Sequence, residues 1–166
     1  MSRIHWPAGL FAAGATLWGA GVLLAPLGLT STAGPASRAT AAIVYVAGSV
    51  VCHQRPERSF AWAGHALPVC ARCTGIYLGA AAAVLIALTL TNGTGAPGLD
   101  GPLPGRNARR AVVLALVPAL LSLVWEWTTG HTPSNVVRAA TGAVMGSVVA
   151  WVVMAALRAG RPVGVN

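Results

Sequence analysis

Residues 52–60 read CHQRPERSF and residues 68–79 read PVCARCTGIYLG, and this stretch of the chain contains all three of its cysteines. It also contains two of the four histidines, three of the eleven arginines and one of the three acidic residues. Most of the remaining sequence is apolar or small. This concentration of polar chemistry indicates that the functional site lies here, and that the apolar segments on either side serve to position it.

The overall composition is that of a membrane protein. Hydrophobic residues make up 55% of the chain and charged residues 8%, and the mean hydropathy is +0.68. Soluble domains carry about 25% charged residues, so a surface that faces water could not be built from so few. We therefore predict an integral membrane protein whose surface contacts the lipid bilayer.

The net charge of +8 comes from eleven arginines and no lysine. A basic chain is typical of nucleic-acid binding, but these arginines lie singly or in pairs at the ends of apolar segments, where membrane topology places them. No nucleic-acid partner is therefore expected. The absence of lysine and the many Ala, Gly and Val residues indicate a GC-rich genome. The expected location is the cytoplasmic membrane of a bacterium.

Five apolar segments predict an all-α fold: a polytopic membrane helix bundle with four or five transmembrane helices, in a single integral membrane domain of residues 1–166. About 20 residues of helix cross the hydrocarbon core. The second segment has only 12 uncharged residues, from Thr40 to Val51, or about 18 Å of helix, which is short for a span. The first is too long for a signal-peptide core and is expected to be retained. The segments lie at about residues 8–29, 38–52, 70–91, 110–127 and 135–157.

The arginines also predict an orientation, because loops on the cytoplasmic side are enriched in basic residues. If all five segments span, six arginines share one face, and the other face carries three with two more at its edge. The six are Arg38, Arg106, Arg109, Arg110, Arg158 and Arg161; the others are Arg3, Arg55 and Arg58, with Arg72 and Arg138 at the edge. The cysteine loop is then expected on the outer face.

One expected juxtaposition does not depend on the second segment. The third segment leaves the membrane face that carries the cysteines, and the fourth returns to it. Polar residues near the end of the fourth segment and the start of the fifth should therefore lie at the level of the cysteines. These residues are Glu126, His131, Asn135 and Arg138.

The cysteine spacing predicts a metal site. Cys70 and Cys73 form a Cys-x-x-Cys pair at the start of a helix, and Cys52 precedes them by seventeen intervening residues. Three cysteines and a histidine make the tetrahedral Cys₃His site typical of zinc, with His53 or His65 as the fourth ligand. Two alternatives remain: a redox-active dithiol, since Cys-x-x-Cys at a helix start also favours thiolate chemistry, and a plain disulfide or inert buried thiols.

The other polar residues are expected to form a shell around this site. Arg55 and Arg58 are interpreted as solvated loop charges, with anion binding as the alternative. Glu126 is the one acidic residue inside a predicted membrane segment, where an ionisable group suggests a function. We expect it to form an ion pair with Arg138 or Arg72, the alternatives being proton handling or ligand contact. Asn135 completes the shell.

The motifs resemble a family of small prokaryotic membrane proteins of unknown function. The resemblance rests on Cys-His-Gln at 52–54, Arg-Ser-Phe at 58–60 and Cys-x-Arg-Cys-Thr-Gly at 70–75, and covers roughly residues 45–146. A second family block, Asn-x-x-Arg-x-x-Thr-Gly-x-x-x-Gly, is similar to Asn135, Arg138, Thr141, Gly142 and Gly146. The resemblance implies a small polytopic membrane protein and supplies no activity.

The chain departs from this family at one place. The family often carries an aspartate after a proline in the fourth segment, with a glutamine one turn later. The matching positions here are Pro118, Ser122 and Glu126, so the carboxylate is displaced by four residues. Positions i and i+4 lie on the same helix face. The acid can serve the same cluster from there, or an aspartate-dependent function has been lost.

We therefore expect a metal-stabilised scaffold, or an accessory subunit of a membrane complex, that binds zinc. The alternative is a membrane enzyme, either metal-dependent or a thiol-disulfide oxidoreductase that uses Cys70 and Cys73. A small-molecule or ion carrier is the least favoured class, because ionisable residues within the membrane are few. Gly75 with Gly79, and Gly142 with Gly146, allow close helix packing, either within the chain or in a homo-oligomer or partner complex.

Overall fold

The computed structural model describes residues 6–93 and 105–158. Five α-helices account for most of them, which confirms the predicted all-α membrane helix bundle. The helices are α1 (Trp6–Leu24), α2 (Pro35–Val51), α3 (Ala71–Gly93), α4 (Gly105–Thr129) and α5 (Asn135–Arg158). The remaining elements are two 3₁₀ segments, η1 (Ala25–Leu29) and η2 (Pro56–Arg58), and an antiparallel hairpin of β1 (Ala61–Trp62) and β2 (His65–Ala66).

Four of these helical stretches are long and apolar enough to cross a membrane. They are Trp6–Leu29, Ala71–Thr89, Gly105–Thr129 and Asn135–Arg158. Within the described chain, α2 is not among them: it has 17 residues and packs mainly against η1. Of the four or five predicted transmembrane helices, four therefore qualify by length and composition. The predicted grouping of Arg38 with Arg106, Arg109 and Arg110 assumed that all five segments span; with four spans, Arg38 would share the side of the cysteines.

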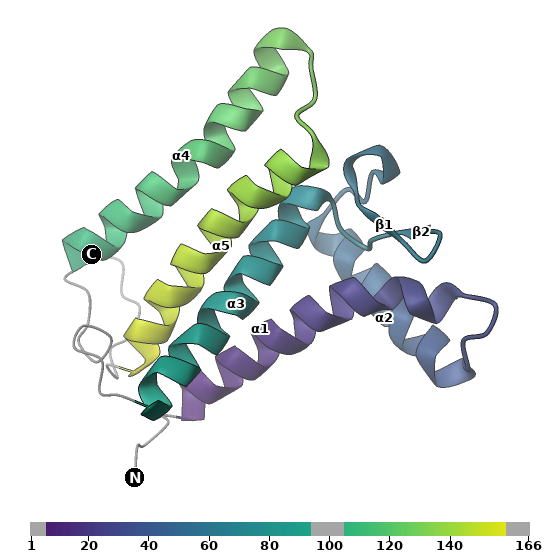
Figure 1. The fold of residues 1–166 in the computed structure, drawn as a ribbon, viewed down its shortest axis with the longest axis horizontal. Coiled ribbons are helices and arrows are strands. Elements are labelled where there is room, and N and C mark those ends of the chain that lie inside the picture. Colours follow the sequence, from purple (N-terminus) through teal and green to yellow (C-terminus); the bar gives the residue numbers. More distant parts are fainter. Residues whose placement is uncertain (1–5, 94–104, 159–166) are drawn as a thin grey trace.

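The centre of the bundle is the pair of α3 and α5, two parallel helices that lie side by side (Figure 1). Glycines bring the two backbones into direct contact. A Cβ atom at Gly75 would lie 2.0 Å from the carbonyl oxygen of Ala139, and one at Gly146 would lie 2.0 Å from that of Ile76. Only glycine fits such an approach. The small-residue pairs noted in the sequence thus join two helices of one chain.

The other helices pack around this pair. α1 lies against the opposite side of α3, and small side chains of α1, α3 and α5 fill the space between them. The buried cluster consists of Ala8, Ala12, Ala83, Val84, Ala87, Ala150 and Met154. α4 contacts α5 through one buried stripe at helical spacing, Ala115, Ala119, Ser122 and Glu126. The polar half of that stripe faces the end of the bundle where α3 begins.

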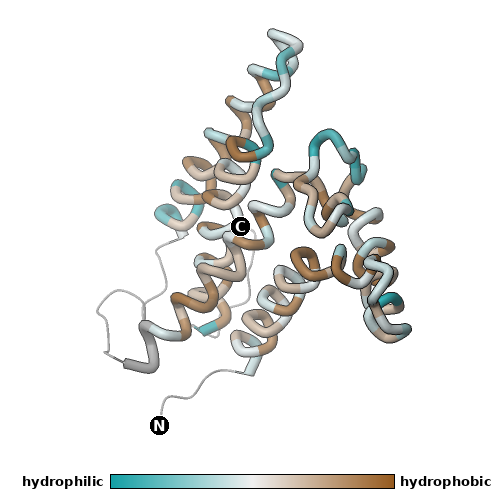
Figure 2. Tube along the Cα trace, turned by 45° about the vertical axis from the view of Figure 1, so that its right-hand side comes forward, coloured by the Kyte–Doolittle hydropathy of each residue, from teal (hydrophilic) through white to brown (hydrophobic). Residues whose placement is uncertain are grey.

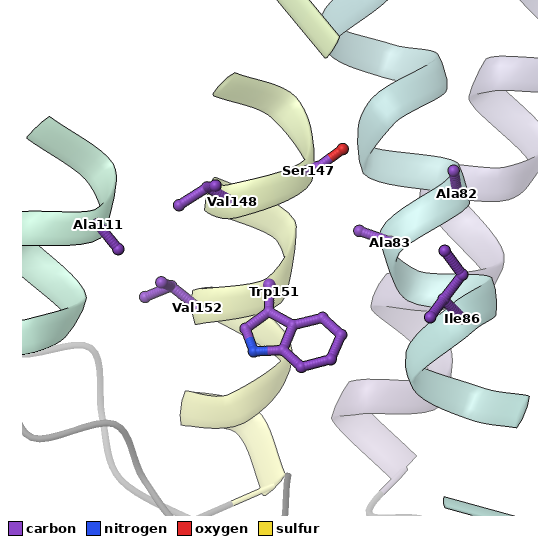
Figure 3. Close-up of a pocket in the computed structure, with 8 residues that line it drawn as sticks. All are labelled: Ala82, Ala83, Ile86, Ala111, Ser147, Val148, Trp151 and Val152. Atoms are coloured by element: carbon purple, nitrogen blue, oxygen red, sulfur yellow. The ribbon is translucent and has the colours of Figure 1, made fainter. Parts of the chain in front are cut away.

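The outer surface of the bundle is apolar, as lipid contact requires. Large hydrophobic side chains on the outer face of α4 are well exposed, including Leu114 at 69% and Leu121 at 63%. Hydrophilic residues gather near the ends of elements and in the loop around η2 (Figure 2). A pocket of about 460 Å³ between α3, α4 and α5 has an apolar lining apart from Ser147, whose hydroxyl donates to the carbonyl of Gly79 (Figure 3). That pocket therefore carries no reactive group.

Candidate metal centre

The three cysteines come together at the start of α3. Cys52 caps the C-terminal end of α2, Cys70 immediately precedes α3, and Cys73 lies in its first turn. Their sulfur atoms all lie within 4.8 Å of one another. All three are free thiols, and each is half-buried. Zn–S bonds of about 2.3 Å in tetrahedral geometry place ligand sulfurs about 3.8 Å apart, so a small closure of this cluster would make a three-sulfur metal site.

The local electrostatics favour a thiolate at Cys70. The Cys73 thiol hydrogen-bonds the sulfur of Cys70, and the backbone N–H groups of Cys73 and Arg72 and the Cys52 thiol add to this effect. Together they lower the pKa of the Cys70 thiol well below its usual range, although burial opposes them. The backbone N–H of Cys70 donates in turn to the sulfur of Cys52, at 3.2 Å. Thiolate is the form of cysteine that binds metal ions.

Gln54 fixes the position of this cluster, a role that the sequence did not reveal. Its side-chain amide donates to the carbonyl oxygens of Tyr45 at 2.7 Å and of Pro68 at 2.8 Å. It therefore ties α2 to the segment that leads into Cys70. Gly48 permits this closeness, since a Cβ atom there would lie 2.5 Å from the Pro68 oxygen. Gln54 adopts a positive φ of 47°. The signal for it was its place in the Cys-His-Gln motif.

No histidine nitrogen joins the three sulfurs in the described part of the chain. His53 is exposed, but it lines the same pocket as the cysteines. His65 lies on β2, where it pairs with Trp62 of β1, and does not line that pocket. Of the two histidines considered as a fourth ligand, His53 is thus the one beside the cluster. The geometry brings together three ligands from the chain and leaves a fourth direction that faces the pocket.

Glu126 joins the end of α4 to the cysteine loop and to α5. Its Oε1 atom lies 2.9 Å from an Arg58 nitrogen and 3.0 Å from an Arg138 nitrogen. Glu126 and Arg138 are both buried. The predicted ion pair with Arg138 is confirmed. The other predicted partner, Arg72, instead donates to the hydroxyl of Ser122, at 2.9 Å, one turn before Glu126.

The remaining residues of the predicted shell fall into place around these contacts. The Asn135 side chain donates to the backbone carbonyl of Ser59, at 3.1 Å, so that α5 also holds the cysteine loop. Arg55 is exposed at the pocket. His131, expected at the same level, is exposed and hydrogen-bonds only Thr129 within the described residues. The expected return of the fourth and fifth segments to the level of the cysteines is seen in three contacts: α4 with the cysteine loop, α4 with the start of α3, and α5 with the cysteine loop.

The donor set defines what this centre can hold. Three cysteine sulfurs form a soft site, which selects zinc, copper(I) or iron–sulfur chemistry over the harder cations that prefer oxygen. Zinc fits three thiolates and a fourth ligand in tetrahedral geometry. Arg55, Arg58 and Arg72 line the same pocket as the three cysteines. The site is thus suited to a soft metal ion at one end of the helix bundle.

These features define a class: a small membrane helix bundle with a three-cysteine centre and an arginine shell at one end. Residues 52–152 match the family of predicted membrane proteins DUF2085, and the chain belongs to this family. An uncharacterized protein of Methanothermobacter thermautotrophicus is 37% identical over 95 residues, covering 55% of this chain and 74% of the relative. The uncharacterized protein MJ1492 of Methanocaldococcus jannaschii is 49% identical over 43 residues, 26% of this chain and 28% of the relative. No solved structure matches the chain.

Proposed function

We propose that Cys52, Cys70 and Cys73 hold one zinc ion at a membrane interface, and that this ion stabilises the protein as a membrane scaffold or accessory subunit. The observation that carries the proposal is the meeting of three sulfurs from separate elements within 4.8 Å. A structural zinc site contributes its binding energy to folding. We also infer that the Cys-His-Gln, Arg-Ser-Phe and Cys-x-Arg-Cys-Thr-Gly motifs are the part of this site that family members share.

The scaffold role is supported by which elements the metal would connect. α2 packs mainly on η1, away from the tight pair of α3 and α5. A metal bound by Cys52 together with Cys70 and Cys73 would fasten the end of α2 to the start of α3. Gln54 makes the same connection through hydrogen bonds. The metal and the Gln54 hydrogen bonds would thus join the same two segments, as expected for a structural metal site.

A metal-dependent membrane enzyme is the second candidate, and one observation favours it. The described chain offers three sulfurs and no histidine nitrogen in the cluster, and the cluster opens on a pocket of about 470 Å³. Catalytic zinc sites typically have three protein ligands and an open fourth position, whereas structural sites are closed by four. The change in thermal stability when zinc is removed distinguishes the scaffold role from the enzyme role.

We further propose a single integral membrane domain in the cytoplasmic membrane of a prokaryote, with the cysteine loop on the outer face. Arg106, Arg109 and Arg110 begin α4 at the opposite end of the bundle, and loops rich in arginine remain in the cytoplasm. Arg3 and Arg161, also used for the predicted orientation, lie outside the described residues. Protein partners or a homo-oligomer would contact the exposed apolar faces, for which lipid is the other occupant.

The test is the metal content of the protein purified in a neutral detergent. We expect about one zinc per chain by mass spectrometry of the elements, and loss of most of it in Cys73→Ser. In the scaffold role, removal of zinc by 1,10-phenanthroline lowers the midpoint of thermal unfolding. In the enzyme role, zinc removal leaves the midpoint unchanged.

His53→Gln and His65→Gln form a matched pair of controls. We expect both to retain zinc, because neither nitrogen joins the sulfurs. Loss of zinc in His53→Gln alone would instead identify a closed Cys₃His site. If the wild-type protein contains no metal and Cys70 and Cys73 form a disulfide that cycles with reductant, the zinc proposal is wrong and a thiol-disulfide oxidoreductase replaces it.

A further inference from the structure

The pocket beside the three sulfurs is strongly basic. It has a volume of about 470 Å³, which lies within the range of small-molecule sites, about 300–1,000 Å³. Arg55, Arg58 and Arg72 line it, and none of the described residues that line it is acidic. Glu57, between Arg55 and Arg58 in sequence, is exposed and does not line the pocket. Three arginines from two different parts of the chain, the loop around η2 and the start of α3, therefore line the pocket.

Among the described residues, one carboxylate forms ion pairs with the arginines around this pocket. Both ion pairs within the described residues involve the same oxygen of Glu126, which is shared between Arg58 and Arg138. Arg72 has no carboxylate partner there and donates only to the neutral hydroxyl of Ser122. Its Nε atom is buried and has no hydrogen-bond partner in the described chain. A buried charged donor without a partner destabilises the folded protein more than a buried neutral donor does.

The excess of positive charge persists when the cysteines hold zinc. Within the described residues, Glu126 is the one carboxylate that pairs with any of the four arginines Arg55, Arg58, Arg72 and Arg138, which leaves three positive charges without a carboxylate partner. Three thiolates around a zinc ion contribute one net negative charge, and two positive charges then remain. Partly buried charges are stable when they are paired, and the pocket is the space where a partner can enter.

We infer that this pocket binds a phosphate-bearing anion between Arg55, Arg58 and Arg72. Guanidinium groups donate two parallel hydrogen bonds to phosphate oxygens, which is why arginine is the common phosphate ligand. The inference goes beyond the zinc site, since the arginines attract an anion with or without metal. Because the pocket lies where membrane-spanning helices begin and end, the phosphate can belong to a lipid headgroup or to a soluble compound.

Two probes separate these sources. In the first arm, inorganic phosphate is titrated into the full chain in a neutral detergent and binding heat is measured, before and after treatment with the uncharged chelator 1,10-phenanthroline. In the second arm, the chain is placed in nanodiscs of phosphatidylcholine with phosphatidylglycerol. Lipids that remain bound after transfer to detergent are then identified by native mass spectrometry.

Arg72→Gln and Arg55→Gln test the pocket, with Arg38→Gln as the matched control. Arg38 is exposed and donates to the backbone of Ser31, outside the pocket. Loss of one charge-assisted contact should weaken phosphate binding about tenfold in Arg72→Gln, and Arg38→Gln should leave it unchanged. Arg55 is exposed and its side chain makes no hydrogen bond in the described chain. Arg55→Gln therefore keeps the test decisive if Arg72→Gln does not fold.

Each outcome bears on the inference. Saturable phosphate binding that the pocket variants weaken supports a soluble phosphate compound. Retention of phosphatidylglycerol that the pocket variants abolish, without phosphate binding, supports a lipid headgroup. Absence of both, or equal binding by the pocket variants and Arg38→Gln, overturns the inference. Zinc content is measured on the same samples, so a failed zinc site and a failed anion site are told apart.

Discussion

Helix α5 packs mainly against α3 and α4, and it is held to these two helices in different ways. Against α3, glycines allow backbone to touch backbone, so that any side chain at Gly75 or Gly146 would collide with a carbonyl group. Against α4, the buried contacts are small residues along the helix and, at one end, the ion pair of Glu126 with Arg138. An apolar pocket separates α4 from the α3–α5 pair in another part of the bundle (Figure 3).

The difference shows how the bundle separates folding from function. In lipid, apolar side chains gain little by leaving the solvent, so close packing and hydrogen bonds hold helices together. The α3–α5 pair uses close packing and forms a rigid centre. The α4–α5 pair uses a charge network that also includes the cysteine loop through Arg58. Substitutions at the α3–α5 interface should unfold the bundle, whereas substitutions at the α4–α5 interface should perturb the loop that carries the cysteine site.

The largest effect is expected from Gly146→Ala. Its new methyl group would meet the backbone of Ile76 at 2.0 Å, and neither helix can yield without separating from the other. We expect the free energy of unfolding to fall by about 3 kcal/mol, measured by SDS titration in mixed micelles. Gly14→Ala is the matched control, because Gly14 lies in α1 with nothing within 4 Å of its Cβ position. Equal stability of the two variants would show that α3 and α5 do not pack through glycine.

Glu126→Gln should have the next largest effect, and it acts on the other interface. The amide keeps one acceptor but removes the carboxylate charge that, among the described residues, offsets Arg58 and Arg138. We expect a loss of about 2 kcal/mol in the same titration, with faster hydrogen exchange at the end of α4. Glu57→Gln removes an exposed acid from η2 and should change stability little. If both variants behaved alike, the charge network would not hold α4 in place.

Much of the fold could be predicted from the sequence because its signals are local. Apolar runs between Gly/Pro-rich turns mark the helices, and the shortness of the second run explains why α2 is not long enough to qualify as a span. The pair of Glu126 and Arg138 followed from threading the chain through the membrane. The glycine spacing predicted a close contact but could not say whether it lies within one chain, because both arrangements need the same residues.

The finer structure of the site depends on loop conformation, which sequence periodicity does not encode. The ion pair of Arg58 with Glu126 depends on where the loop around η2 places Arg58. The role of Gln54 consists of side-chain hydrogen bonds to two carbonyl groups, and its place in the Cys-His-Gln motif does not reveal these partners. The proposed fourth ligand was chosen by residue type alone, and the hairpin that carries His65 directs it away from the pocket of the sulfurs.

Gln54→Ala has the smallest expected effect. It should weaken the proposed metal site and leave both the α3–α5 and the α4–α5 interface unchanged. The Gln54 amide donates to Tyr45 and Pro68, so its loss frees the segment before Cys70 without touching a sulfur. Residues that orient metal ligands typically contribute 10–100-fold to affinity, and we expect zinc affinity to fall about tenfold, measured by competition with a zinc-binding dye. Ser49→Ala, on the exposed face of α2, should leave affinity unchanged. Unchanged zinc affinity in Gln54→Ala would mean that the α3 end of the bundle alone positions the metal ligands, and that the link to α2 is a consequence of the site rather than its support.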